Sequence, residues 1–314
     1  MNSNERSDVV GVILAAGKGT RIRPFSHTFP KPLLPVLDKP LMVWQIESMR
    51  AMGVKDITIV IGHLGHEIVT SLGDGSKLGV RLSYVEQESM LGIAHAVAQL
   101  ERHVDRPFLL FLGDIFFETT NLDSMLEMFR QDGVSGVLAV KPEPDPEALR
   151  RNFTVAVGED GFVSRVVEKP RHPSTNLKGC GLYLFDTTVF DAIRRTPRTA
   201  LRDEYELTDA IQIFIENGYK LLPAPVVERD LNLSLPADLL DLNLHVMTSR
   251  GLDGFTAPGA IVGDGARLER CVVMDGAVVA AGAHLVECLA LPGARVPGGE
   301  HRRTVFSQDQ AVSC

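Results

Sequence analysis

Residues 12–21 read V-I-L-A-A-G-K-G-T-R, and residues 30–35 continue with P-K-P-L-L-P. The run over 9–15 is short and apolar, as is typical of a buried parallel strand, and it leads directly into a loop of small residues. Gly17 and Gly19 let the backbone approach a ligand and turn its N–H groups inward, which suits a chain of phosphates. The stretch therefore predicts an α/β protein in which a buried strand ends at a polyphosphate site.

Two common phosphate-binding loops do not fit this stretch. A Walker A loop needs Ser or Thr directly after Gly-Lys, and here Gly19 follows Lys18. A dinucleotide-binding loop needs a third glycine near position 22, where the sequence has Ile22. Lys18, Arg21 and Lys31 nevertheless place positive charge on this segment, so a phosphate ligand is still expected.

Strand and helix patterns alternate around this loop, over the segment 9–140. Apolar segments at 56–61, 80–85 and 108–112 are expected strands, and 41–52 and 91–103 have helical periodicity. This order predicts a mostly parallel sheet with helices on both faces.

The middle of the chain departs from that alternation. Residues 153–157 and 162–167 flank the turn Glu159-Asp160-Gly161 and predict an antiparallel hairpin. Pro236 fits the first turn of a helix that runs to about Thr248. An antiparallel insertion that carries part of a pocket fits this region.

The C-terminal segment 251–314 has a composition of its own, with 10 of the 28 glycines and no lysine. From Val262 a column of mostly aliphatic residues recurs at every sixth position: Val262, Leu268, Met274, Ala280, Val286, Pro292. The alternative is an irregular tail rich in Val, Ala and Gly, but a hexapeptide period in several registers is typical of left-handed β-helices. We therefore expect two domains, 1–249 and a short left-handed β-helix at 250–314. A solenoid of about two coils buries little core and is expected to pack on the first domain or on another subunit.

Composition limits the partners of the chain. The 32 Lys and Arg against 40 Asp and Glu give a net charge of −8, which argues against a general nucleic-acid binder. The four cysteines are too scattered for a disulfide framework and indicate reduced thiols in a cytoplasm. Residues 1–8 lack the apolar part of a signal peptide, and no run of 18 apolar residues predicts a membrane span.

The order of motifs along the chain resembles the sugar-1-phosphate nucleotidylyltransferases, especially the glucose-1-phosphate thymidylyl- and uridylyltransferases. The matching motifs are G-x-G-T-R at 17–21, Lys31, L-G-D-G at 72–75, Gln87 with G-I-A at 92–94, G-D at 113–114, V-E-K-P at 167–170, G-L-Y at 181–183 and E-L-T-D at 206–209. The resemblance covers about residues 9–245 and implies a Rossmann-like nucleotidyltransferase domain. A C-terminal left-handed β-helix also occurs in part of this family.

The family reaction is attack by a sugar-phosphate oxygen on the α-phosphorus of a nucleoside triphosphate, with release of pyrophosphate. The resemblance implies that Arg21 holds the leaving phosphates, Lys31 stabilises charge at the α-phosphorus and Lys169 holds the phosphate of the sugar. Gln87 and Gly92 would read a pyrimidine base. The implied nucleotide-binding residues are Leu14, Ala16, Gly17, Gly19, Thr20, Gln87 and Gly92. The implied sugar-phosphate residues are Ile115, Phe153, Glu168, Lys169 and Gly181, and the implied Mg²⁺ ligands are Asp114 and Asn232.

Three positions depart from the family pattern. The family usually has a second metal carboxylate in a W-x-D-x-G-T segment, where residues 230–235 read D-L-N-L-S-L and place Asn232. Asp230 would point to the same strand face and compensate for the missing charge. Ile115 replaces a residue that is commonly polar, and Phe153 would fill space that a family glycine leaves for the sugar. All three changes lie on the sugar and metal side, whereas the triphosphate motifs are intact.

Three hypotheses follow. The favoured one is an enzyme that makes an NDP-sugar from an NTP, with dTTP or UTP preferred, and a less usual, less hydroxylated sugar 1-phosphate. The second is a weak or inactive paralogue that binds nucleotide sugars for regulation or assembly. The third is a non-enzymatic subunit of a larger complex. We expect Mg²⁺ as cofactor, a homo-oligomer, and neither nucleic-acid nor membrane partners.

Overall fold

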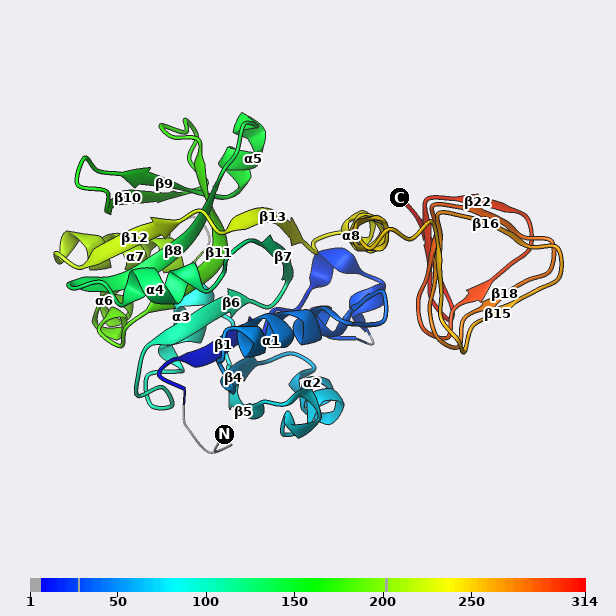
Figure 1. The fold of residues 1–314 in the computed structure, drawn as a ribbon, viewed down its shortest axis with the longest axis horizontal. Coiled ribbons are helices and arrows are strands. Elements are labelled where there is room, and N and C mark those ends of the chain that lie inside the picture. The colour runs from blue at the N-terminus through cyan, green and yellow to red at the C-terminus, as the bar shows by residue number, and fades with distance from the viewer. Residues whose placement is uncertain (1–6, 28, 201–202) are drawn as a thin grey trace. The chain divides into compact units, whose positions relative to one another are not determined.

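The computed structural model describes residues 7–27, 29–200 and 203–314; the predicted polar N-terminus falls largely outside them, at residues 1–6. The chain divides into two compact units, which are described separately (Figure 1). The first unit is Met1–Gly17 with Gln45–Asp230, and the second is Lys18–Trp44 with Leu231–Cys314. The domain boundary expected near residue 250 stays a prediction.

The helices and strands of the described residues have the following bounds. The helices are α1 (Leu41–Ala51), α2 (Gly65–Leu72), α3 (Ile93–Ala98), α4 (Ser124–Phe129), α5 (Pro146–Arg151), α6 (Val189–Arg195), α7 (Leu207–Glu216) and α8 (Pro236–Ser249). The longer strands are β1 (Val10–Ala15), β4 (Asp56–Ile61), β5 (Arg81–Glu86), β6 (Phe108–Leu112), β7 (Ile115–Thr119), β8 (Val134–Pro142), β9 (Phe153–Val157), β10 (Val163–Glu168), β11 (Leu177–Phe185), β12 (Lys220–Ala224) and β13 (Val227–Asn232). The short strands are β2 (Pro35–Val36), β3 (Lys39–Pro40), β14 (Phe255–Thr256), β15 (Ile261–Val262), β16 (Arg267–Glu269), β17 (Val272–Val273), β18 (Val278–Val279), β19 (His284–Val286), β20 (Leu289–Ala290), β21 (Arg295–Val296), β22 (Glu300–Arg302), β23 (Thr304–Phe306) and β24 (Ala311–Ser313).

A nine-stranded mixed sheet forms the centre of the first unit. β1 pairs in parallel with β4 and with β6, and β4 pairs in parallel with β5. β11 runs antiparallel to both β6 and β8, and the β9–β10 hairpin extends the sheet beyond β11. The parallel sheet predicted for the N-terminal part and the antiparallel insertion predicted for the middle are both confirmed.

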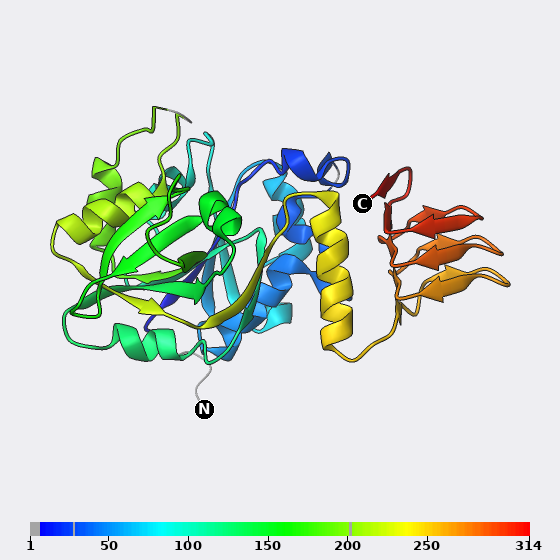
Figure 2. The same ribbon diagram turned by 90° about the horizontal axis from the view of Figure 1, so that it is seen from above.

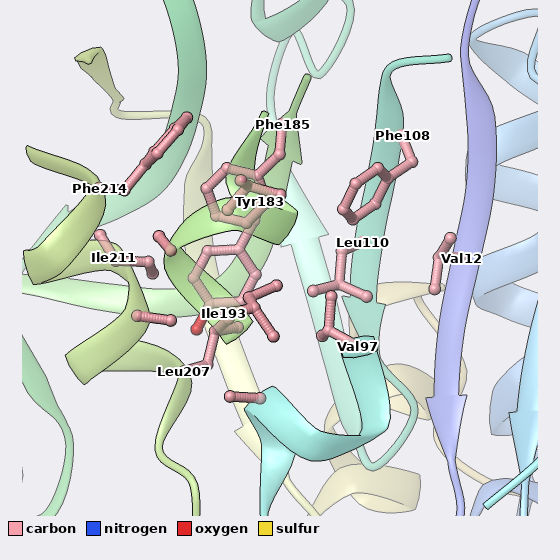
Figure 3. Close-up of a cluster of buried hydrophobic side chains, with 14 of the residues drawn as sticks. Val12, Val97, Phe108, Leu110, Tyr183, Phe185, Ile193, Leu207, Ile211 and Phe214 are labelled. Atoms are coloured by element: carbon pink, nitrogen blue, oxygen red, sulfur yellow. The ribbon is translucent and has the colours of Figure 1, made fainter. Parts of the chain in front are cut away.

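A layer of buried aromatic and aliphatic side chains lies on one face of this sheet (Figure 3). Phe108 on β6 and Phe185 on β11 are fully buried, and their rings are 6.0 Å apart between centroids. Phe214 from α7 meets Phe185 edge-on, while α3 and α6 contribute Val97 and Ile193 to the same layer. Burial of each such side chain stabilises the fold by about 2 kcal/mol, so this packed layer holds the strands of the sheet in place.

In the second unit, a buried asparagine on α8 holds the segment that follows Lys31. Asn243 has no exposed surface, and its Oδ1 accepts a hydrogen bond from Leu37 N at 2.8 Å. Its Nδ2 donates to Pro35 O at 3.1 Å and to Leu239 O at 2.9 Å. Because every one of these groups would be costly to bury unpaired, α8 fixes the Pro35–Leu37 backbone.

The C-terminal strands stack in three parallel sheets and form a three-sided coil, seen end-on in Figure 1 and from the side in Figure 2. The sheets are β14-β17-β20-β23, β15-β18-β21 and β16-β19-β22, and β24 closes the first of them in antiparallel pairing with β23. Side chains such as Val273, Val279 and Leu285 fill the interior. The expectation of stacked parallel strands in the tail is confirmed.

The predicted hexapeptide period is wrong in detail. Val262 pairs with Val279, and Val279 pairs with Val296, so these three valines are equivalent positions of successive coils. Each coil is therefore one position shorter than three hexapeptides. Two corners of the coil take four residues each, at 274–277 and 280–283, but the corner at 287–288 takes only two. Glu287 turns this short corner with a positive φ of 51°, which explains the missing residue.

The state of the cysteines and the character of the helices are relevant to the predicted cytoplasmic location. Cys180, Cys271, Cys288 and Cys314 are all free thiols. Within the described part of the chain, no helix has both the length and the apolar character needed to cross a bilayer. The cytoplasmic location stays a prediction.

Candidate active site

The carboxyl ends of β1, β4, β5 and β6 lie next to one another and are joined by backbone hydrogen bonds. Gly113 N donates to Leu14 O at 2.9 Å, and Gln87 N donates to Ile61 O at 2.8 Å. A Cβ on Gly113 would lie 2.6 Å from Leu14 O, and one on Gly62 would lie 2.9 Å from Ala16 O. Since no side chain fits at either glycine, the strand ends approach each other closely. This is the edge at which parallel α/β sheets bind ligands.

Asp114 stands at this edge, on a turn whose backbone is held from both sides. Gln45 on α1 donates from Nε2 to Leu112 O at 2.8 Å and to Ile115 O at 2.7 Å. Gln45 is only 3% exposed, and among the described residues its Oε1 has no hydrogen-bond partner. Gln45 is not among the predicted site residues, and its one signal in the sequence is a polar side chain within an otherwise apolar helical segment, LMVWQI.

The residues expected to read the base are also held by neighbours. Gln87 is 5% exposed, and its Nε2 lies 2.9 Å from His95 Nδ1. Gly92 has a φ of 108°, and a Cβ there would lie 2.5 Å from Tyr205 O. Tyr205 N in turn donates to Leu91 O at 2.7 Å. The structure thus brings Gln87 and Gly92 together with His95 and Tyr205, to which the sequence analysis assigned no role.

Glu168 and Lys169 form an ion pair at the end of β10. Lys169 Nζ lies 3.2 Å from Glu168 Oε1, and Thr208 Oγ1 donates to Glu168 Oε2 at 3.4 Å. Lys169 adopts a positive φ of 44°, and its N donates to Asn152 O at 3.0 Å. The left-handed backbone at Lys169 is a strained conformation of the kind that concentrates at functional sites.

Phe153, expected to face the sugar, belongs to the buried core. Its side chain is 7% exposed and stacks on Tyr183, with centroids 6.1 Å apart. The ring occupies the place where a Cβ of Gly179 would stand, because that Cβ would lie 1.8 Å from Phe153 Cζ. A contact of Phe153 with a sugar stays a prediction.

Ile115 and Gly181, two other expected sugar-phosphate residues, are neighbours. Gly181 has a positive φ of 71°, and a Cβ there would lie 2.8 Å from Ile115 Cδ1. The side chain of Ile115 is itself buried. Gly181 therefore leaves the room in which Ile115 packs.

Asp230, expected to compensate for the neutral Asn232, is engaged elsewhere. Its Oδ2 lies 2.6 Å from Lys178 Nζ, and its Oδ1 lies 3.1 Å from Lys141 Nζ. Burial lowers the pKa of Lys141, but the charge of Asp230, its hydrogen bond to the lysine and the charge of Glu143 together outweigh burial and raise that pKa. Burial and the charge of Asp230 also raise the pKa of Cys180. Because lysines hold both carboxylate oxygens, this arrangement argues against Asp230 as a metal ligand.

The second unit contains the remaining phosphate-loop residues. Gly19 has a positive φ of 59°, and its O accepts a hydrogen bond from Ser26 Oγ at 2.7 Å. A Cβ on Gly19 would lie 3.4 Å from the Cβ of Lys31, whose side chain is buried. Thr20 and Arg21 are exposed in a single 3₁₀ turn. The loop thus brings Gly19 and Lys31 together and leaves Arg21 at the surface.

Asn232 is exposed at the end of β13, and its Oδ1 lies 3.5 Å from Ser234 Oγ. Gly17 ends the first segment of the first unit, and the position of a Cβ on it has open space around it. Of the expected ligand residues, the first unit holds Leu14, Ala16, Gly17, Gln87, Gly92, Asp114, Ile115, Phe153, Glu168, Lys169 and Gly181, and the second holds Gly19, Thr20, Arg21, Lys31 and Asn232.

The carboxylate oxygens of Asp114 are the kind of ligand that a hard cation such as Mg²⁺ prefers. Over residues 7–27, 29–200 and 203–314, no three or more His, Cys, Asp or Glu side chains gather as a closed metal cage. Asp114 instead offers carboxylate oxygens on a half-buried, rigid turn. Mg²⁺ is commonly bound by one or two carboxylates together with substrate phosphates and water, so Asp114 fits this ion.

Comparison with known proteins identifies the chain. Residues 10–227 match the family model described as nucleotidyl transferase. The chain belongs to the nucleotidyl transferase family. A Haloferax volcanii relative, the low-salt glycan biosynthesis nucleotidyltransferase Agl11, is 36% identical over 77% of this chain and 67% of its own. A glucose-1-phosphate thymidylyltransferase of Streptomyces griseus is 36% identical over 75% of this chain and 65% of its own. The aligned part of this nucleotidyltransferase therefore spans about two thirds of the length of these relatives.

Two further comparisons concern a shorter relative and the fold. The UTP–glucose-1-phosphate uridylyltransferase AglF of Haloferax volcanii is 32% identical to this nucleotidyltransferase over 72% of the chain and 92% of its own length. The solved UDP-glucose pyrophosphorylase with bound UDP-glucose superposes with a TM-score of 0.67 over 77% of this chain and 99% of that one. At 21% identity, this second likeness shows the fold alone.

Proposed function

We propose that this nucleotidyltransferase moves a nucleoside monophosphate from an NTP to a sugar 1-phosphate and releases pyrophosphate, forming an NDP-sugar. The observation that carries the proposal is that Leu14, Gln87 and Asp114 lie along the same edge of the sheet, at the carboxyl ends of the parallel strands in the order β6-β1-β4-β5. Relatives at 32–36% identity are named as enzymes of this reaction class.

The chemistry needs charge neutralisation and alignment rather than a covalent catalyst. An oxygen of the sugar phosphate forms a bond to the α-phosphorus, and the bond to the β-phosphate oxygen breaks, with its electron pair leaving on pyrophosphate. Arg21 binds the leaving phosphates, Lys31 neutralises charge at the α-phosphorus, and Lys169 holds the attacking phosphate. Asp114 and Asn232 would hold Mg²⁺, which neutralises phosphate charge when bound.

The proposed substrates follow from the names of the relatives and from the residues near the expected sugar site that depart from the family pattern. The names of the relatives favour dTTP or UTP as nucleotide and glucose 1-phosphate or a related compound as acceptor. Ile115 and Phe153 are apolar and buried where the family pattern is commonly polar or empty, so neither offers a hydrogen bond to a hydroxyl group, which favours a less hydroxylated sugar. Glu168 would accept hydrogen bonds from the remaining hydroxyl groups.

The proposal also covers the handedness of the coil, the domain boundary, the location of the protein and its oligomeric state. The C-terminal coil is left-handed, as the family resemblance implies, and the nucleotidyltransferase domain ends at residue 249. The protein works in the cytoplasm as a homo-oligomer, without nucleic-acid or membrane partners. No observation favours the inactive or purely structural alternatives.

The test is pyrophosphate release by the full chain with Mg²⁺, each of the common NTPs and a panel of sugar 1-phosphates. We expect release with dTTP or UTP and at least one sugar phosphate, and loss of release in Lys31→Ala with little change in thermal unfolding. Tight nucleotide binding without release for every pair would contradict the enzymatic function.

A further inference from the structure

Two of the four cysteines are neighbours inside the C-terminal coil. Cys271 directly precedes β17 and Cys288 directly precedes β20, and these strands pair in parallel with Val272 opposite Leu289. Cys271 and Cys288 are therefore equivalent positions of successive coils. Both side chains belong to the packed interior of the coil and are almost fully buried.

The two sulfur atoms lie within reach of each other. Cys288 N donates to Cys271 Sγ at 3.4 Å, and the two thiols are hydrogen-bonded to each other. Neighbouring strands of a sheet lie about 4.8 Å apart, and disulfides join residues whose Cα atoms are about 4.4 to 6.8 Å apart. The spacing of successive coils therefore suits a disulfide between these two cysteines.

Both cysteines lie in short corners, outside the paired strands. Arg270 and Cys271 form a two-residue corner between β16 and β17, and Glu287 and Cys288 form the same corner one coil later. Arg270 and Glu287 each turn their corner with a positive φ of 51°. A disulfide needs Cβ atoms about 3.5 to 4.5 Å apart. Because the corner residues lie outside the strands, they can make this approach while the strands keep their register.

Oxidation of the pair leaves two nearby carbonyl groups with their other partners. Each thiol donates to the carbonyl oxygen two residues before it, at 3.3 and 3.4 Å, and loses this proton when a disulfide forms. These two oxygens, Glu269 O and Val286 O, also accept backbone N–H groups at 2.8 and 2.9 Å. The fold therefore avoids the cost of an unpaired polar group at either carbonyl.

The two thiols differ in acidity. A hydrogen bond from Cys271, backbone N–H groups and the charge of His301 together outweigh burial and lower the pKa of Cys288 to about 7. The hydrogen bond to Cys288 and burial raise the pKa of Cys271. Since the thiolate is the reactive form of cysteine, Cys288 is the thiol that attacks first and Cys271 is the one that completes the bond.

We propose that Cys271 and Cys288 are a modification site at which hydrogen peroxide forms a disulfide between successive coils. Hydrogen peroxide is close to water in size, and it suits thiols that directly follow the exposed Arg270 and the half-buried Glu287. Disulfides of this kind in a reducing compartment are usually transient. The site is independent of the proposed reaction.

The chemistry takes two steps. The thiolate of Cys288 attacks one peroxide oxygen and the O–O bond breaks, which gives a sulfenic acid and a hydroxide ion. The sulfur of Cys271 then bonds to the sulfur of Cys288, and the sulfenic oxygen leaves with the proton of Cys271 as water. The hydroxide takes up the proton that Cys288 released. Two thiols thus lose two electrons and two protons, and one peroxide becomes two waters; a dithiol reductant reverses the change.

The disulfide would lie beside the ion pairs that connect the coil to α8. Glu287 pairs with Arg270 at 3.2 Å and with Arg303 at 3.5 Å. Arg303 also pairs with Asp241 on α8 at 2.6 Å. Oxidation therefore joins two coils at the corner whose charged side chains hold the coil against this helix.

Mass spectrometry of the alkylated protein tests the site. The full chain is reduced, treated with a small excess of hydrogen peroxide, denatured and alkylated with N-ethylmaleimide. We expect two alkylated cysteines, Cys180 and Cys314, instead of four. Trypsin releases residues 271–295 as one peptide with both remaining cysteines, and we expect this peptide unalkylated and lighter than its reduced form by two hydrogen atoms. Four alkylated cysteines, or a peptide with separate oxygen atoms on its two cysteine sulfurs, would overturn the proposal.

Two variants test whether proximity directs the reaction. Cys314→Ser removes the exposed thiol, and the 271–288 disulfide should form to the same extent. If the disulfide needs Cys314, it arises by exchange through the surface and the proposal falls. Cys271→Ala should leave Cys288 without a disulfide partner within the chain. A disulfide from Cys288 to another cysteine at the wild-type rate would equally overturn the assignment.

Thermal unfolding shows whether the bond fits the folded coil. The oxidised protein should unfold at a temperature about 4 °C higher than the reduced protein, because the bond closes the loop 271–288 in the unfolded chain. Dithiothreitol should abolish the rise, Cys314→Ser should retain it, and Cys271→Ala should lack it. An oxidised wild type that unfolds at the same or a lower temperature would show that the disulfide distorts the coil, and would overturn the proposed fit.

Discussion

The aromatic ring of Phe153 fills the space directly over the backbone of Gly179. The two residues lie on strands β9 and β11, and a Cβ on Gly179 would lie 1.8 Å from Phe153 Cζ. The ring is buried and continues the aromatic stack through Tyr183 to Phe185. The phenylalanine and the glycine are thus mutually dependent, because the core has room for the ring only where residue 179 has no side chain.

Gly179→Ala should destabilise the protein by about 2 kcal/mol, because the added methyl group overpacks a buried ring. Urea unfolding of the full chain measures this change. Gly254→Ala is the matched control, since the nearest atom to its Cβ would be 3.7 Å away. In a Phe153→Ala background the same substitution should cost less than half as much; strictly additive effects would show that the two residues are independent.

Gln45→Leu should weaken the apparent affinity for Mg²⁺, because Gln45 holds the carbonyl groups on both sides of Asp114. Outer groups that orient metal ligands are worth about 10- to 100-fold in metal affinity, so we expect the half-saturating Mg²⁺ concentration for pyrophosphate release to rise about tenfold. Gln131→Leu, at an exposed position, is the control. An unchanged Mg²⁺ titration in a folded Gln45→Leu protein would show that this clamp does not orient the metal site.

Asn232→Asp should have the opposite effect. If Asn232 is a ligand, replacing its amide by a carboxylate adds a negative charge that a hard cation prefers, and the half-saturating Mg²⁺ concentration should fall several-fold. The measurement is pyrophosphate release as a function of Mg²⁺ at fixed NTP. If the half-saturating Mg²⁺ concentration does not change, residue 232 does not bind the metal.

Asp230→Leu should destabilise the first unit by about 3 kcal/mol, because it leaves the ammonium group of Lys178 buried without its carboxylate and leaves Lys141 only Glu143, 3.6 Å away. Thermal and urea unfolding measure the loss. Replacing both lysines by Met in the same chain should restore most of the stability, since a buried ion cluster and an apolar cluster of similar volume are nearly equivalent. Wild-type stability in Asp230→Leu alone would contradict the assigned burial of the cluster.

The parts of this protein that could be predicted from sequence are those set by local pattern. The apolar run that ends at Ala15 and the run that ends before Asp114 each predicted a buried strand, and the structure has both strands. The repeat tail was placed correctly as stacked strands, but the shortening of its coil was missed, because a corner turned by a left-handed Glu287 leaves no mark in composition.

The contacts that organise the site could not be predicted, because they join residues far apart in the chain. Gln45 reaches Leu112 and Ile115 across the sheet, and nothing near Gln45 in sequence indicates that contact. His95 showed no partner in sequence, yet it meets Gln87 once β5 and α3 pack together. Asp230 looked like a spare metal ligand until the fold placed two lysines against it.

The fate of labelled phosphate tests the central claim most directly. The full chain is incubated with Mg²⁺, a sugar 1-phosphate and UTP or dTTP that is labelled at either the α- or the γ-phosphate. We expect the α-label to appear in an NDP-sugar and the γ-label in pyrophosphate, in equal amounts. If the nucleotide binds but the α-label stays in NTP, or is released as NMP without a sugar, the protein is not a sugar-1-phosphate nucleotidyltransferase.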